Sequence, residues 1–258
     1  MRLYFKYFAI QLKSEMEHKL SFWLTTIGQF ITAFSAVLGI YFLLSRFHAI
    51  EGFSFSEVLL CYAIVLVGFT LAECFARGFD TFFVMLGNGE FDRILVRPRG
   101  EIFQVFASKI EFGRIGRLLQ AFAVLLYAIP ASGAHWSLSN IFLLITMLLG
   151  GFTVFMGLFI LYATLCFFTT EGLEFMNIFT YGSKEFGQYP VSVCGKEILA
   201  VFTYIVPIAL FQYYPLLYLL GKSENLLYFF LPMLTPLFLI PCLALWKLGV
   251  RKYHSTGS

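Results

Sequence analysis

The stretch IFLLITMLLGGFTVFMGLFILYATLCFF, from Ile141 to Phe168, carries no ionisable residue. It lies inside a longer charge-free window that runs from Trp136 to Thr170. A hydrocarbon core about 30 Å thick is crossed by roughly 20 apolar helical residues, so this window is long enough to span a membrane. Because backbone amides in lipid must be satisfied within their own segment, we expect a helix here. The stretch therefore predicts an all-α integral membrane protein.

The rest of the chain repeats this pattern. Five more windows without ionisable residues are Leu20–Ser45, Val58–Ala72, Leu118–Ala134, Ile198–Gly221 and Asn225–Trp246. Composition agrees: the chain is 59% hydrophobic and 13% charged, whereas soluble domains are about a quarter charged. These values exclude a soluble globule, a disordered tail and a nucleic-acid binder. We predict one transmembrane domain over residues 1–258, with helices at about 20–45, 57–76, 117–135, 139–169, 198–212 and 226–247.

Basic residues are divided unequally between the two sides of this predicted bundle. When the segments between the six spans are assigned to alternate sides, sixteen of the eighteen Lys and Arg residues fall on one side. The positive-inside rule then places both termini in the cytoplasm. Ahead of the first span, residues 1–19 have an apolar stripe beside a charged one, which is typical of an amphipathic helix in the membrane plane. A helical extension of the first span explains the same periodicity.

The loop over residues 77–116 is the longest polar segment, and with Arg117 at its end it holds seven basic residues. Leu86 to Gly89 reads as a turn, and Glu90 to Val96 as two helical turns that stop at Pro98. Phe91, Ile94 and Leu95 share one face of this short helix. An apolar face with charged flanks fits docking into a groove of another protein. A helix lying on anionic lipid fits the same pattern.

Prolines interrupt the fifth window at Pro207 and Pro215. Because proline weakens a helix, we expect the outer part of this window to turn back as a re-entrant segment between helices five and six.

Residues that carry catalytic chemistry are scarce. No GxxxxGK[ST] motif occurs, and the five cysteines and four histidines are dispersed, so no catalytic, cofactor or metal site is expected in this chain. Glu73 lies near the inner boundary of the second span with Arg77 one turn below, and we favour an interfacial ion pair between them over a role in translocation. We expect no charge deep in any span. Energy for uphill transport is then expected from outside the chain.

Several motifs, in this order and sidedness, resemble ABC-type permeases of the type-2 export class. They are Gly89-Glu90-Phe91-Asp92-Arg93-Ile94-Leu95-Val96-Arg97-Pro98, Tyr181-Gly182 with Gln188-Tyr189-Pro190, Ile205-Val206-Pro207, Tyr213-Tyr214-Pro215-Leu216 and Leu220-Gly221. The likeness covers nearly the whole chain and looks closest to bacterial stand-alone six-helix permeases. It implies a permease subunit of an ATP-driven exporter in the bacterial cytoplasmic membrane.

The resemblance also implies partners and site residues. A second permease, identical or related, would complete the path, and a separate cytoplasmic ATPase dimer would hold ATP and Mg. The coupling helix that contacts this ATPase would comprise Glu90, Phe91, Asp92, Arg93, Ile94, Leu95, Arg97 and Pro98. A second cytoplasmic contact would involve Tyr181, Gly182, Tyr189 and Pro190, and an outer gate Tyr213, Tyr214, Pro215 and Gly221. The alternatives are a channel or secondary carrier, and a non-transporting membrane scaffold or sensor.

Overall fold

The computed structural model describes residues 2–47, 49–169 and 174–253. Met1, where the predicted N-terminal helix starts, lies outside these residues. In the described part every regular element is helical, as predicted. The longer helices are α1 (Arg2–Glu15), α2 (Lys19–Phe47), α3 (Phe55–Phe75), α8 (Ile115–Ala131), α9 (Leu138–Thr169) and α15 (Leu239–Lys252).

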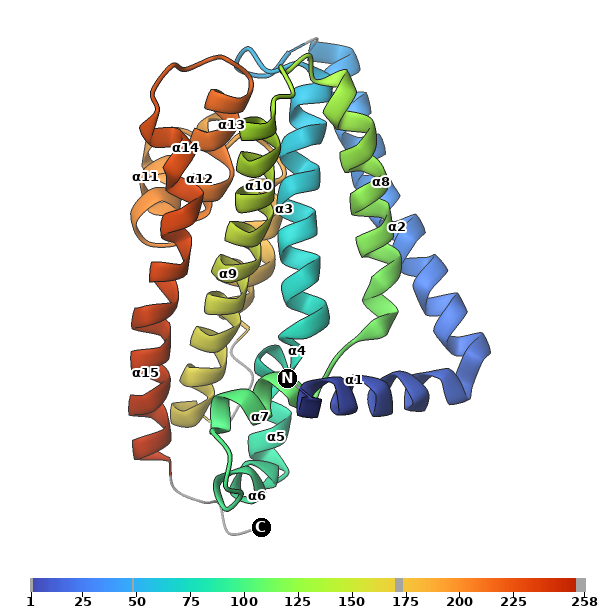
Figure 1. The fold of residues 1–258 in the computed structure, drawn as a ribbon, viewed down its shortest axis with the longest axis vertical. Coiled ribbons are helices and arrows are strands. Elements are labelled where there is room, and N and C mark those ends of the chain that lie inside the picture. Colours follow the sequence, from blue (N-terminus) through green and yellow to red (C-terminus); the bar gives the residue numbers. More distant parts are fainter. Residues whose placement is uncertain (1, 48, 170–173, 254–258) are drawn as a thin grey trace.

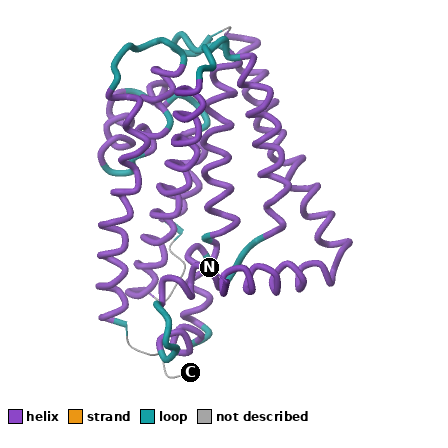
Figure 2. The backbone as a smooth tube through the Cα atoms, in the orientation of Figure 1, coloured by secondary structure: helices purple, strands orange, loops and turns teal. Residues whose placement is uncertain are grey.

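Shorter helices connect the long ones. They are η1 (Met16–His18), α4 (Arg77–Asp80), α5 (Phe82–Gly87), α6 (Glu90–Leu95), α7 (Glu101–Ser108), η2 (Phe112–Arg114), η3 (Ile178–Gly182), α10 (Ser183–Gly187), η4 (Val191–Cys194), α11 (Lys196–Tyr204), α12 (Ile208–Phe211), α13 (Tyr213–Leu219), α14 (Leu227–Leu234) and η5 (Thr235–Phe238). Figure 2 shows how much of the backbone these helices occupy.

The long helices stand side by side as a bundle with two distinct ends (Figure 1). Helices α1 and α4–α7 lie at one end, which we call the α6 end, and α13 lies near the other, which we call the α13 end. The start of α1 and the last turn of α15 are both at the α6 end. The first and last described residues therefore share one end of the bundle.

Five helices of the described chain are long and apolar enough to cross a membrane: Lys6–Arg46, Phe55–Phe75, Phe112–Ala131, Leu138–Thr169 and Leu227–Lys252. A sixth is counted only if two bent pieces, Lys196–Tyr204 and Ile208–Leu219, form one span. The angle between these pieces is 84°. Within the predicted span over 198–212 the chain breaks at Pro207, one of the two prolines expected to weaken the helix there, because proline lacks the amide hydrogen.

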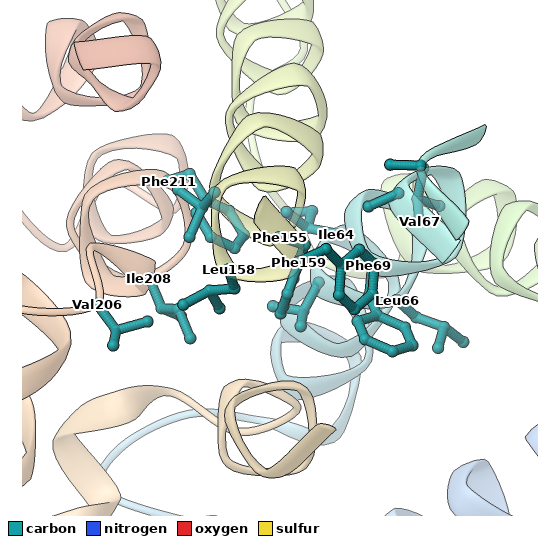
Figure 3. Packing of buried hydrophobic residues seen from close by; sticks show 14 of the residues in the cluster. Ile64, Leu66, Val67, Phe69, Phe155, Leu158, Phe159, Val206, Ile208 and Phe211 are labelled. Carbon is teal, nitrogen blue, oxygen red and sulfur yellow. The ribbon is translucent and has the colours of Figure 1, made fainter. Parts of the chain in front are cut away.

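Helix α3 forms the centre of the bundle and contacts α2, α8, α9 and α10. It approaches α9 closely at Gly68, where an added Cβ atom would lie 2.8 Å from the Cα atom of Gly151. Such contact between small residues is how helices pack tightly in membranes. Figure 3 shows the core beside this crossing, where Phe69 of α3, Phe155 of α9 and Phe211 of α12 meet.

Helix α1 runs across the α6 end instead of continuing the line of α2 (Figure 1), with the short turn η1 between them. Its side chains pack on the end of α7 and on the segment that follows it. Gln11 donates to the carbonyl oxygens of Ala107 and Ser108 at 3.1 and 2.8 Å and accepts from the amide of Ile110 at 2.6 Å. Phe8 stacks edge-on against Phe112. Helix α1 is therefore not collinear with α2.

Candidate functional site

The predicted coupling helix is present as α6, which spans Glu90–Leu95. Gly89 precedes it with φ +67°, a left-handed conformation that glycine adopts without strain and that turns the chain sharply after α5. The end of α6 is held by Gln104 of α7, whose amide donates to the carbonyl oxygens of Ile94 and Arg99 at 3.1 and 2.9 Å. Helices α4–α7 therefore form a braced helical platform at the α6 end.

The apolar face of α6, formed by Phe91, Ile94 and Leu95, was predicted to dock on another protein. For two of these three residues that prediction is wrong. Phe91 is fully buried and Ile94 is 7% exposed, whereas Leu95 is 43% exposed. The Phe91 ring packs against Phe82, Phe167, Trp246 and Tyr253, with centroids 5.1–6.2 Å away. The sequence pattern shows which residues share a face but not which body covers that face. Here the platform's own contacts with α9 and α15 cover it.

A different set of residues faces outward from α6 and the turn after it. Leu95 and the 83% exposed Val96 are flanked by the exposed residues Glu90, Arg93, Arg97 and Pro98. Beside them is a cavity of about 220 Å³ lined by Glu90, Arg93, Arg97 and residues of α1, α5 and α7. We call Glu90, Arg93, Leu95, Val96, Arg97 and Pro98 the α6 surface. It combines an apolar centre with exposed charges around it, an arrangement common at protein interfaces.

Behind the platform, Glu73 is the centre of a buried charge network at the end of α3. It is fully buried and accepts from Arg117 at 2.7 Å, while Arg114 lies 3.3 Å from its other oxygen. Arg117 also donates to Gln29 of α2 at 2.7 Å. The predicted pairing of Glu73 with Arg77 is therefore wrong. Its true partners are 41 and 44 positions further along and could not be found from helical spacing.

Arg77 instead joins α4 to two other segments. It pairs with Asp80, lies 2.6 Å from Glu111 and donates to the Tyr181 hydroxyl at 2.7 Å. Tyr181 in turn donates to Asp80 at 2.9 Å. Burial raises the pKa of Asp80 despite Arg77, and burial with the Asp80 charge raises the pKa of Tyr181. Burial alone would lower the pKa of Arg77, but its three partners raise it, so the arginine stays charged.

The four residues of the predicted second contact do not form one surface. Tyr181 lies at the α6 end, but the chain then climbs along α3 through η3 and α10 (Figure 1). At Tyr189 its carbonyl oxygen accepts from Gln212 at 2.8 Å, and Gln212 also contacts Cys61, close to the far end of α3. Pro190 follows and is buried. Tyr189 and Pro190 therefore lie well away from the α6 end.

The predicted spans leave Lys184 and Lys196 in the loop between helices four and five, among the sixteen basic residues assigned to one side. The path of the chain along α3 corrects both positions. Lys184 lies 5.4 Å from the ring centroid of Phe69, six residues or about 9 Å from the end of α3. Lys196 follows Cys194, whose pKa is raised by burial and then by Glu51, a residue of the α2–α3 loop at the α13 end. Neither lysine lies with the basic residues of the α6 end. Lys184 therefore packs beside α3 within the bundle, although its own helix, α10, is not one of the candidate spans.

The predicted outer-gate residues lie together at the α13 end. Tyr213, Tyr214 and Pro215 form the first turn of α13, and Gly221 follows the helix with φ +68°. The Tyr214 hydroxyl lies 3.2 Å from that of Thr203 in α11, and its ring packs on Tyr228 of α14. Lys222 then ties this segment to the first turn of α3 through Glu57 at 2.8 Å. The four residues thus belong to one connected region.

No group of three or more His, Cys, Asp or Glu side chains in the described ranges is placed to hold a metal ion. Sequence reasoning missed two charged groups, the network of Glu73, Arg114 and Arg117 and the pair Lys184–Glu185. The charge-free windows leave Lys184 and Glu185 in the loop between the predicted fourth and fifth spans. The only available signal was the run of aromatic residues on either side of them.

Comparison with known families gives one match that covers most of the chain. A family model described as "ABC-2 family transporter protein" matches residues 30–257. Comparisons with curated proteins and with solved structures gave no match. The matched range contains α3–α15 together with most of α2, and so includes the platform and the region of α11–α13.

Proposed function

Because this multi-pass membrane protein belongs to the ABC-2 transporter family, we propose that it is the permease subunit of an ATP-driven exporter. In this proposal a second permease, identical or related, completes the translocation path, and a separate cytoplasmic ATPase dimer binds ATP and Mg and supplies the energy. The observation that carries the proposal is the family match over residues 30–257, combined with a braced helical platform at one end of the bundle.

The α6 end is the cytoplasmic side in this proposal. Basic residues gather there on α1, on the platform and at the end of α15, which agrees with the positive-inside rule even without Lys184 and Lys196. Helix α1 then lies in the plane of the cytoplasmic leaflet. The bent segment of α11–α13 is re-entrant from the outer side, with Tyr213, Tyr214, Pro215 and Gly221 as the outer gate.

The α6 surface is the proposed ATPase contact. Leu95 and Val96 would enter an apolar groove, and Arg93 and Arg97 would meet its acidic rim. Phe91 has a different task, because it is buried among Phe82, Phe167, Trp246 and Tyr253. Interiors packed this closely transmit displacement. A shift of α6 caused by ATPase closure would therefore reach α9 and α15 through the Phe91 ring.

The test is co-purification of the chain with the Walker-type ATPase encoded beside it. Leu95→Asp should weaken the complex at least about tenfold, since burying an unpaired charge at the centre of an interface removes a hot spot. Val84→Asp is the matched control, because Val84 of α5 is 46% exposed and also lies on the platform, outside the α6 surface. Phe91→Asp is unsuitable, because a charge at this buried position would unfold the platform.

Two outcomes would count against the assignment. If Leu95→Asp and the arginine reversals Arg93→Glu and Arg97→Glu all leave co-purification and ATP-driven transport intact, the α6 surface is not the contact. If Val84→Asp is as harmful as Leu95→Asp, the contact is not confined to α6. A channel or secondary carrier would transport without any ATPase, and a scaffold would not transport at all.

A further inference from the structure

A polar pocket opens on the side of the bundle between α2, α3 and α10. Its volume is about 290 Å³, and it is lined by Thr32, Ser35, Tyr62, Lys184, Glu185 and Gln188, with Arg117 toward the α6 end. Tyr62 is seven residues from the start of α3, which places the pocket near the middle of that span. An ionised group at this depth is costly when it faces hydrocarbon. The pocket is therefore expected to hold water or a polar ligand.

The two cations of the pocket are already engaged by the protein. Lys184 lies 2.5 Å from Glu185 and over the Phe69 ring, and Arg117 is held by Glu73 and Gln29. Both side chains are tucked inward, with Lys184 14% and Arg117 16% exposed. Neither presents its charge openly to an incoming molecule.

The groups that remain available are mostly hydrogen-bond acceptors. The hydroxyls of Thr32 and Ser35 use their hydrogens on carbonyl oxygens of their own helix, which leaves oxygen lone pairs toward the pocket. Gln188 uses its amide N–H on Glu185 at 2.6 Å. The Glu185 carboxylate is 60% exposed although it is paired. A pocket with an exposed carboxylate and neutral acceptors selects a ligand that is positively charged and donates hydrogen bonds.

We propose that this pocket binds the protonated amine of an amphipathic cation, which is then the class of cargo that the permease exports. The proposal rests on the proposed transport function and specifies its substrate. The pocket is slightly smaller than the range of about 300–1,000 Å³ for sites that enclose whole drug-sized ligands, so it fits a head group. Ala33, Ala36 and Leu66 complete the lining and offer an apolar surface to the adjoining part of the molecule.

The test uses the full-length chain in lipid nanodiscs without ATPase, titrated with three probes that share one tail: dodecylammonium, dodecanol and dodecanoate. Binding is measured by calorimetry after subtraction of empty nanodiscs. Dodecylammonium should bind saturably and at least about tenfold more tightly than dodecanol, because a charge-assisted hydrogen bond distinguishes them. Glu185→Gln should remove this preference, and Glu197→Gln, at an exposed position at the start of α11, should keep it.

Lys184→Gln separates ligand binding from a structural role of the ion pair. Removing the competing cation should tighten dodecylammonium binding, whereas a pair needed only for folding would make this variant weaker in every assay. If Glu185→Gln loses its fold in thermal unfolding, the Lys184→Gln result decides alone. Equal binding of dodecanol, tighter binding of dodecanoate, or absence of saturable amine binding would each overturn the proposal. The last result would indicate that a second permease covers Glu185.

The two proposals can fail separately. Amine binding is measured on the permease alone, so loss of ATPase co-purification would overturn the transporter assignment and leave the pocket standing. Conversely, an ATPase complex that forms while the nanodisc protein shows no amine preference would keep the transporter and reject the cationic cargo.

Discussion

Helices α2 and α3 are both apolar enough to span a membrane, yet they occupy opposite environments. The mean hydropathy of their best windows is 1.9 and 2.3, but 17% of the first window and 89% of the second are buried within the chain. Helix α3 is enclosed by four neighbours, whereas α2 exposes large residues such as Leu24, Ile31 and Phe42. Hydropathy therefore identifies a span without revealing what it faces, because lipid and protein interior are equally apolar.

The difference arises from a few residues of α3 that are matched to partners far along the chain. Gly68 allows close contact with the backbone of α9, and the Tyr62 hydroxyl donates to the Ala33 carbonyl oxygen at 3.0 Å. Glu73 forms ion pairs with two arginines, Arg114 and Arg117. Helix α2 has glycines at 28 and 39 as well, but a Cβ atom at either position would meet no other atom within 4 Å. The substitutions below test whether these specific contacts, and not apolarity, make α3 central.

The largest effect is expected from Glu73→Ala. It leaves Arg117 and Arg114 without their buried anion, and removing one partner of a buried ion pair costs about 3–5 kcal/mol. Gln29→Ala removes the partner that α2 gives to the same Arg117 and should cost about 1.5–3 kcal/mol, the value of one hydrogen bond to a charged group. Unfolding of the purified chain in detergent measures both. Equal losses would mean that Arg117 belongs to α2 as much as to α3.

A smaller loss is expected from Gly68→Ala. The new methyl would lie 2.8 Å from the Cα atom of Gly151, so α3 and α9 must separate, and overpacking of this kind costs about 1–3 kcal/mol. The matched substitution Gly39→Ala in α2 meets open space and should be neutral or stabilising by up to about 1 kcal/mol, since alanine is the better helix former. Thermal unfolding of the two variants compares them directly. A harmless Gly68→Ala would refute the close crossing of α3 and α9.

Local sequence patterns predicted the parts of the fold that depend on neighbouring residues. The charge-free stretch Ile141–Phe168 lies within α9, and the pattern after Gly89 predicted α6 to within one residue. Pro207 was recognised as a weak point, although the 84° bend there exceeds what a proline alone implies. These features follow from helix length, turn chemistry and the missing amide of proline.

The remaining errors concern contacts between distant segments. Phe91 was predicted to contact a partner protein, but α9 and α15 cover its side chain. The spacing of apolar residues along α6 cannot show which body covers that face. Glu73 was paired with the nearest arginine in sequence instead of Arg117. Lys184 was placed in a loop because a charge was taken to exclude a segment from the membrane, while Glu185 neutralises it within the bundle. Each error replaces a long-range partner by a local one.

The smallest effect is expected on the exposed face of α2. Ile31 is 63% exposed, so Ile31→Ala exchanges one lipid contact for another and should change the stability of the single chain by about 0.5 kcal/mol or less. The same substitution becomes informative when two permeases associate, because close packing of side chains is what holds membrane helices together. Crosslinking in the membrane at several expression levels would measure that association. If Ile31→Ala weakens it while unfolding is unchanged, α2 is apolar on the outside because a second permease packs there; if neither changes, the face meets lipid and the permeases join elsewhere.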